Sequence, residues 1–89
     1  SMAATAAWHL LESSQRLADI MACEAMIACE GLEYRDEAPG VGVDALYNHV
    51  RRIVAPLDGD RSLSDEMAEL AYDILNGFGD DEKLTSFLD

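Results

Sequence analysis

Few residues of this 89-residue chain have the types and spacing that site chemistry requires. His9 and Glu12 could offer two metal ligands from one helix turn, but a metal site needs a third and usually a fourth ligand. We therefore expect His9 to be structural or exposed to solvent. Asp58 and Asp60 are spaced as at the start of a calcium loop, but its later positions and closing Glu are absent. We predict a turn there, with Arg61 pairing locally.

Four carboxylates, Glu30, Glu33, Asp36 and Glu37, gather in one short stretch. Paired carboxylates can do acid–base chemistry when a pocket removes them from water. Nothing in the sequence supplies such a pocket, so we predict a solvated acidic patch. The sequence therefore assigns no catalytic, cofactor-binding or metal-binding residue.

The two cysteines, Cys23 and Cys29, are six positions apart in a stretch that is predicted to be helical. At about 100° per residue their side chains would point roughly 240° apart, which is too far for a disulfide. We predict two reduced thiols that do not support the fold.

The amino-acid composition limits the classes of protein to which this chain can belong. Six Lys and Arg against 18 Asp and Glu give a formal net charge of -12, which argues against nucleic acid or an anionic membrane as partner. At 49% hydrophobic residues the chain can form a core, and we expect residues 1–89 to make a single helical domain. No signal peptide or membrane span is recognisable, so we expect a cytoplasmic protein.

The elements that position these residues begin with one long helix. Residues 2–30 contain neither Pro nor Gly, Ser1 can cap the start, and Gly31 is a natural stop. Such a helix would be about 43 Å long, whereas a compact chain of this size is only about 30 Å across. Something outside this chain should therefore cover part of the helix.

The helical wheel shows two apolar sides on this helix, a bulky one and a mostly small one. The bulky side holds Leu10, Leu17, Ile20 and Ile27, and the small side holds Ala7, Leu11, Ala18, Ala22, Ala25 and Cys29. A helix that is apolar around most of its circumference belongs inside a bundle. We expect a homo-oligomer, a dimer or tetramer, formed through the bulky side. Glu24 lies on that side and would be either paired across the interface or a weak point. The alternative is that the later helices of the same chain cover the first.

The remaining elements are shorter. Residues 32–42 carry charge, Pro and Gly without periodicity and are predicted to form a loop. A helix over 43–54 has one apolar face, made by Val43, Leu46, Tyr47, Val50, Ile53 and Val54, and Pro56 prevents its continuation. Another helix is expected over 64–76, with Met67, Leu70, Ala71, Ile74 and Leu75 facing inward. Residues 77–89 are expected to be weakly ordered or a short helix capped by Asp80 and running through Leu88. The predicted fold is all-α, one long helix followed by two or three shorter ones in a bundle.

Several short motifs resemble one family when they are taken in order. Ser1-Met2-Ala3-Ala4, Leu11-Glu12, Leu17-Ala18-Asp19-Ile20, and then Ala28 through Arg35 are similar to the C-terminal part of histidine ammonia-lyase and its aromatic amino acid lyase relatives. Leu57, Asp58, Asp60 and Arg61 match a later motif of the same family. The resemblance covers roughly residues 1–75 and implies a C-terminal fragment of such a lyase.

The resemblance implies that the parent eliminates ammonia from an L-amino acid, and that it does so with a methylidene-imidazolone made from its own Ala-Ser-Gly triad. This chain contains no Ala-Ser-Gly, and Tyr34, Tyr47 and Tyr72 do not match the family's catalytic Tyr. We expect the chain alone to be inactive and without cofactor, and to serve as the bundle and oligomerisation segment of the parent. The alternatives are a freestanding acidic interaction module or regulatory subunit without enzymatic activity, and an independent small enzyme.

Overall fold

The computed structural model describes residues 1–87 and places four helices along them, with no strand in that range. The helices are α1 (Met2–Leu32), α2 (Val41–Ile53), α3 (Ser64–Leu75) and α4 (Glu82–Thr85). The all-α prediction is confirmed. Within these residues no helix is both long enough and apolar enough to cross a bilayer.

The long first helix forms as expected at its start but not at its end. The Ser1 hydroxyl accepts a hydrogen bond from the Ala4 amide at 3.2 Å and caps the N-terminus. The predicted stop at Gly31 is wrong, because the helix continues through Gly31 to Leu32. Gly31 is exposed and does not need a left-handed conformation there, so only its weak helix propensity opposes the last turn.

The other helix boundaries are close to those predicted. Gly40 provides the N-cap of α2, so that helix starts before Val43, and α3 ends at Leu75 where Gly77 takes a φ of 65°. The cap of the last helix is Asp81, not Asp80: its carboxylate accepts the Leu84 amide at 3.0 Å. This helix ends at Thr85, so the predicted extension is wrong for Ser86 and Phe87, which form a turn, and its last residue, Leu88, lies outside the described residues.

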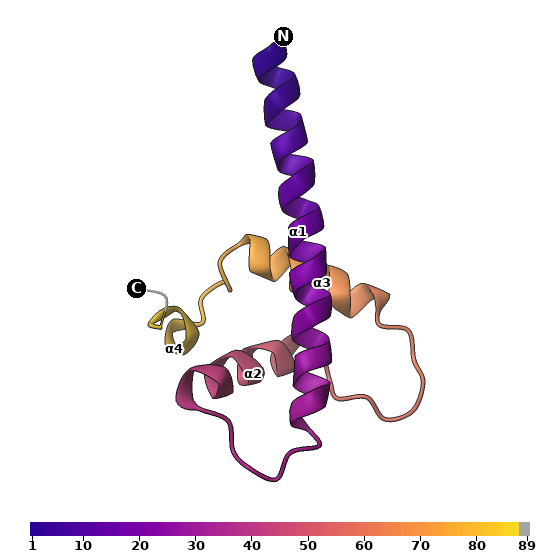
Figure 1. Cartoon of the computed structure of the whole chain (residues 1–89), viewed down its shortest axis with the longest axis vertical. Coiled ribbons are helices and arrows are strands. Elements are labelled where there is room, and N and C mark those ends of the chain that lie inside the picture. The colour runs from indigo at the N-terminus through magenta and orange to yellow at the C-terminus, as the bar shows by residue number, and fades with distance from the viewer. Residues whose placement is uncertain (88–89) are drawn as a thin grey trace.

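The three shorter helices gather around the C-terminal half of α1, while its N-terminal half extends away from them (Figure 1). The core joins all three long helices through small and medium side chains: Ala18, Ala22, Met26, Cys29, Val50, Val54, Leu70 and Ala71. None of residues 1–17 is buried. The molecule measures 55 × 35 × 18 Å with a radius of gyration of 15.2 Å, against about 12 Å for a compact chain of this length. We call residues 1–17 the arm and the rest of the structure the body.

The buried faces of α2 and α3 differ in part from the predicted ones. Val43 and Leu46 were expected to face inward but are exposed, whereas Ala45 and His49 are buried. This shift arises because α4 packs against α2 and covers a side that the apolar periodicity does not mark. In α3, Leu70 and Ala71 are buried as predicted, but Leu75 is exposed.

Candidate functional site

The bulky side of α1 is open to solvent. Leu10, Leu17, Ile20 and Ile27, which we call the α1 stripe, are between 56% and 69% exposed. The chain's own helices cover the opposite, small side only in the C-terminal half of α1, where Ala18, Ala22 and Cys29 are buried, while Ala7 and Leu11 of the arm are exposed. A helix surface with four large apolar side chains in one row is typical of an interaction site. The alternative that the later helices cover the whole of α1 does not describe this structure.

Glu24 lies on the same side of α1 and is exposed. It forms no ion pair within residues 1–87. Burial of the stripe would therefore place its carboxylate in an apolar surface unless a partner supplies a hydrogen-bond donor.

Part of the acidic stretch is built into the structure: the prediction of a solvated patch is wrong for Glu30, which is partly buried, whereas Glu33 is exposed as predicted but also pairs with Arg51. The Arg51 guanidinium donates to Glu30 at 3.2 Å and to Glu33 at 3.0 Å, and the Tyr47 hydroxyl donates to Glu33. The hydrogen bond from Tyr47, with the contacts from Arg51, lowers the pKa of Glu33 below its ordinary value. These contacts tie the end of α1 to α2. They are long-range in sequence, so spacing alone does not reveal them.

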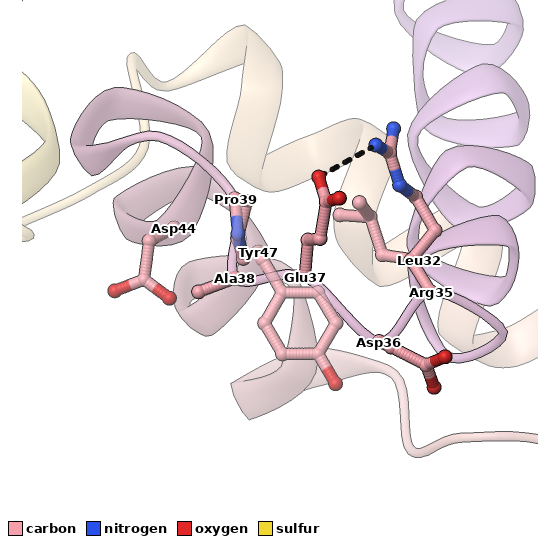
Figure 2. A pocket seen from close by; sticks show the side chains of 8 residues that line it. All are labelled: Leu32, Arg35, Asp36, Glu37, Ala38, Pro39, Asp44 and Tyr47. Carbon is pink, nitrogen blue, oxygen red and sulfur yellow. Dashed lines mark ion pairs between the residues drawn. The ribbon is translucent and has the colours of Figure 1, made fainter.

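The rest of the acidic stretch borders an open cavity. Asp36 and Glu37 lie on the 33–40 loop, which with the start of α2 encloses about 280 Å³ (Figure 2). The one ion pair among the lining residues joins Arg35 to Glu37 at 3.7 Å, and both side chains are mostly exposed. Exposed carboxylates keep their solvation, so the cavity lacks the desolvated acid or base that catalysis needs.

The other residues that the sequence offers as possible metal ligands do not come together in a binding site. His9 is exposed, and the neighbouring Glu12 carboxylate pairs with Arg16 at 3.3 Å. No group of three or more His, Cys, Asp or Glu within residues 1–87 could hold a metal ion. Asp58 and Asp60 lie in an irregular turn, and Arg61 pairs locally with Glu66 and with the Ala55 carbonyl.

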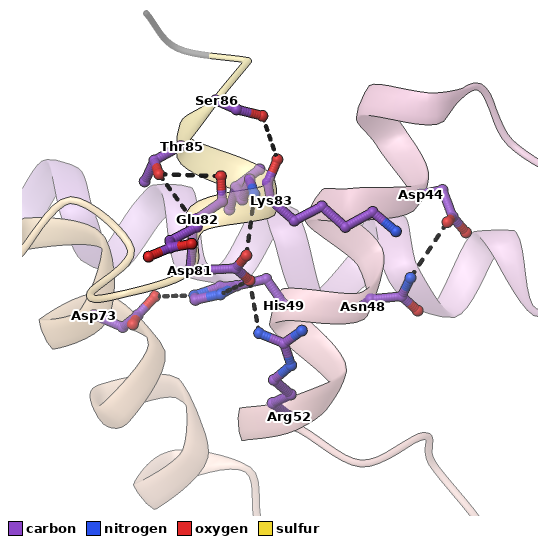
Figure 3. A network of polar contacts seen from close by, with 11 residues as sticks. Asp44, Asn48, His49, Arg52, Asp73, Asp81, Glu82, Lys83, Thr85 and Ser86 are labelled. Carbon is purple, nitrogen blue, oxygen red and sulfur yellow. Dashed lines mark hydrogen bonds and ion pairs between the residues drawn. The ribbon is translucent and has the colours of Figure 1, made fainter.

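A buried histidine that the sequence analysis did not single out fastens three elements together (Figure 3). His49 of α2 is 6% exposed; its Nδ1 lies 2.8 Å from Asp81 and its Nε2 lies 2.5 Å from Asp73. Both ring nitrogens face carboxylate oxygens, and an ionised carboxylate can only accept a hydrogen bond. Both contacts are therefore hydrogen bonds only if the imidazole carries two protons, or if it carries one and one of the two Asp carboxyl groups carries the other. Arg52 adds an ion pair to Asp81 at 2.7 Å.

The turn between α3 and α4 completes this polar network. Gly77, Phe78 and Gly79 all have positive φ, and within residues 1–87 Phe78 is the one residue other than glycine that does. This conformation directs the Phe78 ring edge-on against His49, with centroids 5.5 Å apart. The Leu84 amide and the His49 ring hold the pKa of Asp81 below its ordinary value. With both ring nitrogens engaged, His49 is a structural fastener rather than a free base. The only sequence signal for its burial is its position one turn from Ala45 and Ile53.

The cysteines give a prediction that can be checked directly. Cys23 is exposed and Cys29 is buried, and burial raises the pKa of the Cys29 thiol. A thiol must ionise to react, so we expect iodoacetamide to modify native Cys23 at least about tenfold faster than Cys29. Mass spectrometry of timed samples measures this, and titration in denaturant should find two free thiols per chain. Equal rates in the native protein, or no free thiol in denaturant, would contradict the prediction.

The fold and the open stripe define this chain as an all-α segment built on one long helix that its own body covers only in part. Over most of its length the chain is homologous to the C-terminal region of histidine ammonia-lyases, and the expected resemblance is thereby confirmed. No family model and no solved structure matches it.

Two relatives define the extent of the similarity. The chain is 34% identical over 83 residues to a probable histidine ammonia-lyase of Halobacterium salinarum (strain ATCC 29341 / DSM 671 / R1). That match covers 91% of this chain and 16% of the relative. It is 30% identical over 77 residues to the histidine ammonia-lyase of Deinococcus radiodurans, covering 86% of this chain and 15% of the relative. The chain thus spans about a sixth of the length of the relatives it matches.

Proposed function

We propose that this chain is the assembly segment of a histidine ammonia-lyase-like protein: its long helix packs against helices of other copies, while the parent eliminates ammonia from an L-amino acid. One observation carries the assembly role. The chain's own helices cover the small side of α1 in its C-terminal half and leave the α1 stripe in water. The homology to lyases that are about six times longer supports a role as part of a larger protein.

The energy of burial supports association. Fully burying a Leu or Ile side chain is worth about 1.5–3 kcal/mol, and the four stripe residues are 56–69% exposed. Burying what remains exposed is therefore worth on the order of 4–8 kcal/mol per helix, and a dimer buries two such stripes. A micromolar dissociation constant requires about 8 kcal/mol of net free energy, and the burial of two stripes supplies it when the rigid-body cost of association lies near the lower end of its range of about 4–15 kcal/mol. We therefore expect a dimer or tetramer at micromolar concentrations.

The distribution of charge favours contact through the arm. Glu12 and Arg16 are the only charged side chains within residues 1–17, so the whole net charge of -12 belongs to the body. Repulsion between two acidic bodies weakens with salt, because at 0.1 M exposed charges are screened beyond about 10 Å. Association through the stripe should therefore strengthen as salt is added.

Light scattering coupled to size exclusion tests this proposal. We expect the full chain at tens of micromolar in moderate salt to elute with the mass of a dimer or tetramer, and its dissociation constant to fall as salt rises. A monomer under these conditions would remove the physical support for an assembly role.

The chain alone should not perform the parent's reaction. The lyase family's electrophile forms from Ala-Ser-Gly, which this sequence lacks, so the residues present do not fit that group. We expect no turnover of histidine, tyrosine or phenylalanine, followed as ultraviolet absorbance of urocanate or a cinnamate. Turnover that persists after removal of any full-length lyase would contradict this prediction and favour an independent enzyme.

A further inference from the structure

The segment that follows α3 is attached to the body through one side of α2. Within residues 1–87, α4 packs against α2 and against no other helix. Leu84 of α4 and Ala45 of α2 are buried, yet neither belongs to the core cluster that joins α1, α2 and α3. A helix of four residues has no stability of its own in water. Residues 77–87, which we call the C-terminal latch, can therefore leave α2 without disturbing the core.

The His49 ring is the main polar attachment of this latch (Figure 3). Its Nδ1 faces Oδ2 of Asp81 in the latch, and its Nε2 faces Oδ2 of Asp73 at the end of α3. The Asp81 side chain is 5% exposed and that of Asp73 is 18% exposed, so water does little to stabilise either carboxylate. A neutral imidazole has only one N–H, and its other nitrogen carries a lone pair. A neutral ring would therefore turn that lone pair toward a carboxylate oxygen.

We propose that the C-terminal latch is sensitive to pH: it is closed while the His49 ring carries two protons, and it opens when the ring loses one. Opening exposes Leu84, Ala45 and the ring itself, while α1, α2 and α3 stay packed around their own core. The proposal is independent of the assembly role, because none of these residues belongs to the α1 stripe.

The charges around the ring balance when it is doubly protonated. Arg52 of α2 lies 2.7 Å from the same Asp81 oxygen that faces His49, so two cations then meet the carboxylates of Asp73 and Asp81. Loss of one proton leaves an uncompensated negative charge in a largely buried network, which is costly. The closed latch is therefore favoured below the pH at which the ring loses its second proton, and disfavoured above it.

No further charge enters this balance. Glu82 and Lys83 of α4 lie next to Asp81 in the chain and form no ion pair with the network. Within residues 1–87 no other charged side chain pairs with His49, and α1, which also packs against α2, contributes none.

The two protons reside on the ring and not on a carboxyl group. Asp81 accepts hydrogen bonds from the Leu84 amide, from His49 and from Arg52, and three donors require its ionised form. The Leu84 amide and the His49 ring accordingly hold the pKa of Asp81 below its ordinary value. Between an imidazole and the carboxyl group of Asp73, a shared proton favours the imidazole, because the ordinary pKa of histidine is about 2.6 units higher than that of aspartic acid.

The turn before α4 promotes opening once the proton is lost. Phe78 has a φ of 68°, a left-handed conformation that a bulky residue rarely adopts. The edge-on contact with His49 and the hydrogen bond from the Phe78 amide to the Asp73 carbonyl hold it there. Release of the latch lets Phe78 return to an ordinary conformation, so the strain is relieved together with the unfavourable contact at the ring.

Nuclear magnetic resonance of the His9→Ala chain tests the proposal, because His49 is then its only imidazole. We expect the ring nitrogen shifts to show two protonated nitrogens at about pH 6 and one lone-pair nitrogen at about pH 9. Over the same range the exchange protection of the Leu84 amide, corrected for its intrinsic rate, should fall at least about tenfold, whereas that of Leu70 in the core should persist. A ring that is neutral at about pH 6 overturns the proposal, and so does Leu84 protection that does not follow the ring.

A variant that has no ring proton to lose supplies the second measurement. In His49→Gln the exchange protection of Leu84 should be low and the same at about pH 6 and about pH 9, in contrast to the His9→Ala chain. A loss of protection at alkaline pH that is equal in the two chains overturns the role of His49. If His49→Gln does not fold, the ring titration of the His9→Ala chain still decides.

Discussion

Replacing Ile20 by Asp should convert the assembled chain to monomer. Ile20 lies in the middle of the α1 stripe and is 56% exposed, so the substitution leaves the core of the body intact. It removes a large apolar contact from each helix and adds a carboxylate one turn from Glu24. We expect the dissociation constant to rise by about 15- to 300-fold: the exposed 56% of each Ile20 is worth about 0.8–1.7 kcal/mol, a dimer loses two of them, and tenfold corresponds to about 1.4 kcal/mol. Sedimentation or light scattering over a concentration series measures it.

Two control variants separate stripe burial from charge. Gln15→Asp adds the same charge to the arm on the side away from the stripe and should leave the mass unchanged. Ile20→Leu keeps the apolar volume and should also assemble. An Ile20→Asp protein that keeps the wild-type mass at every concentration would mean that the stripe is not the contact.

Removing the imidazole of His49 should have the largest effect on the stability of the body. His49→Ala leaves the Asp73 and Asp81 carboxylates without their shared partner and opens a cavity beside Phe78. Breaking a buried polar network is among the most destabilising kinds of substitution. We expect the melting temperature to fall by on the order of 10 °C or more, measured by circular dichroism at fixed protein concentration.

The chain's other histidine provides the matched control. His9 is exposed and outside this network, so His9→Ala should leave the melting temperature nearly unchanged. A similar melting temperature for His49→Ala and His9→Ala would contradict the fastening role of His49.

The pH dependence of stability gives a second measurement of this network. The lowered pKa of Asp81 contributes stability above the ordinary Asp range, and this contribution is lost as the pH falls through the lowered value. The acid loss of stability should therefore be smaller in His49→Ala, because one of the groups that lowers the Asp81 pKa is absent. If the stability of His49→Ala falls with acid pH as much as that of the wild-type protein does, His49 is not coupled to Asp81.

The sequence by itself determined the elements of this protein, because the signals for them are local. The absence of Pro and Gly from residues 2–30 predicts the long helix, and Asn76-Gly77 marks the end of α3. The wheel also separates the bulky side of α1 from the small side. Helix propensity, capping and periodicity act within a few residues, so they can be read without knowledge of the fold. The motifs that resemble histidine ammonia-lyase are local in the same way.

Only the tertiary structure decided which side of α1 the chain covers and which polar groups meet. Both sides of the helix are apolar, and the small side is buried because it lets α2 and α3 approach closely. His49 meets Asp73 and Asp81 across 24 and 32 residues of sequence, and Arg51 meets Glu30 across 21. Such contacts depend on how the helices pack, and no spacing along the chain encodes them. The same packing leaves the α1 stripe in water, where a second copy of the chain can cover it.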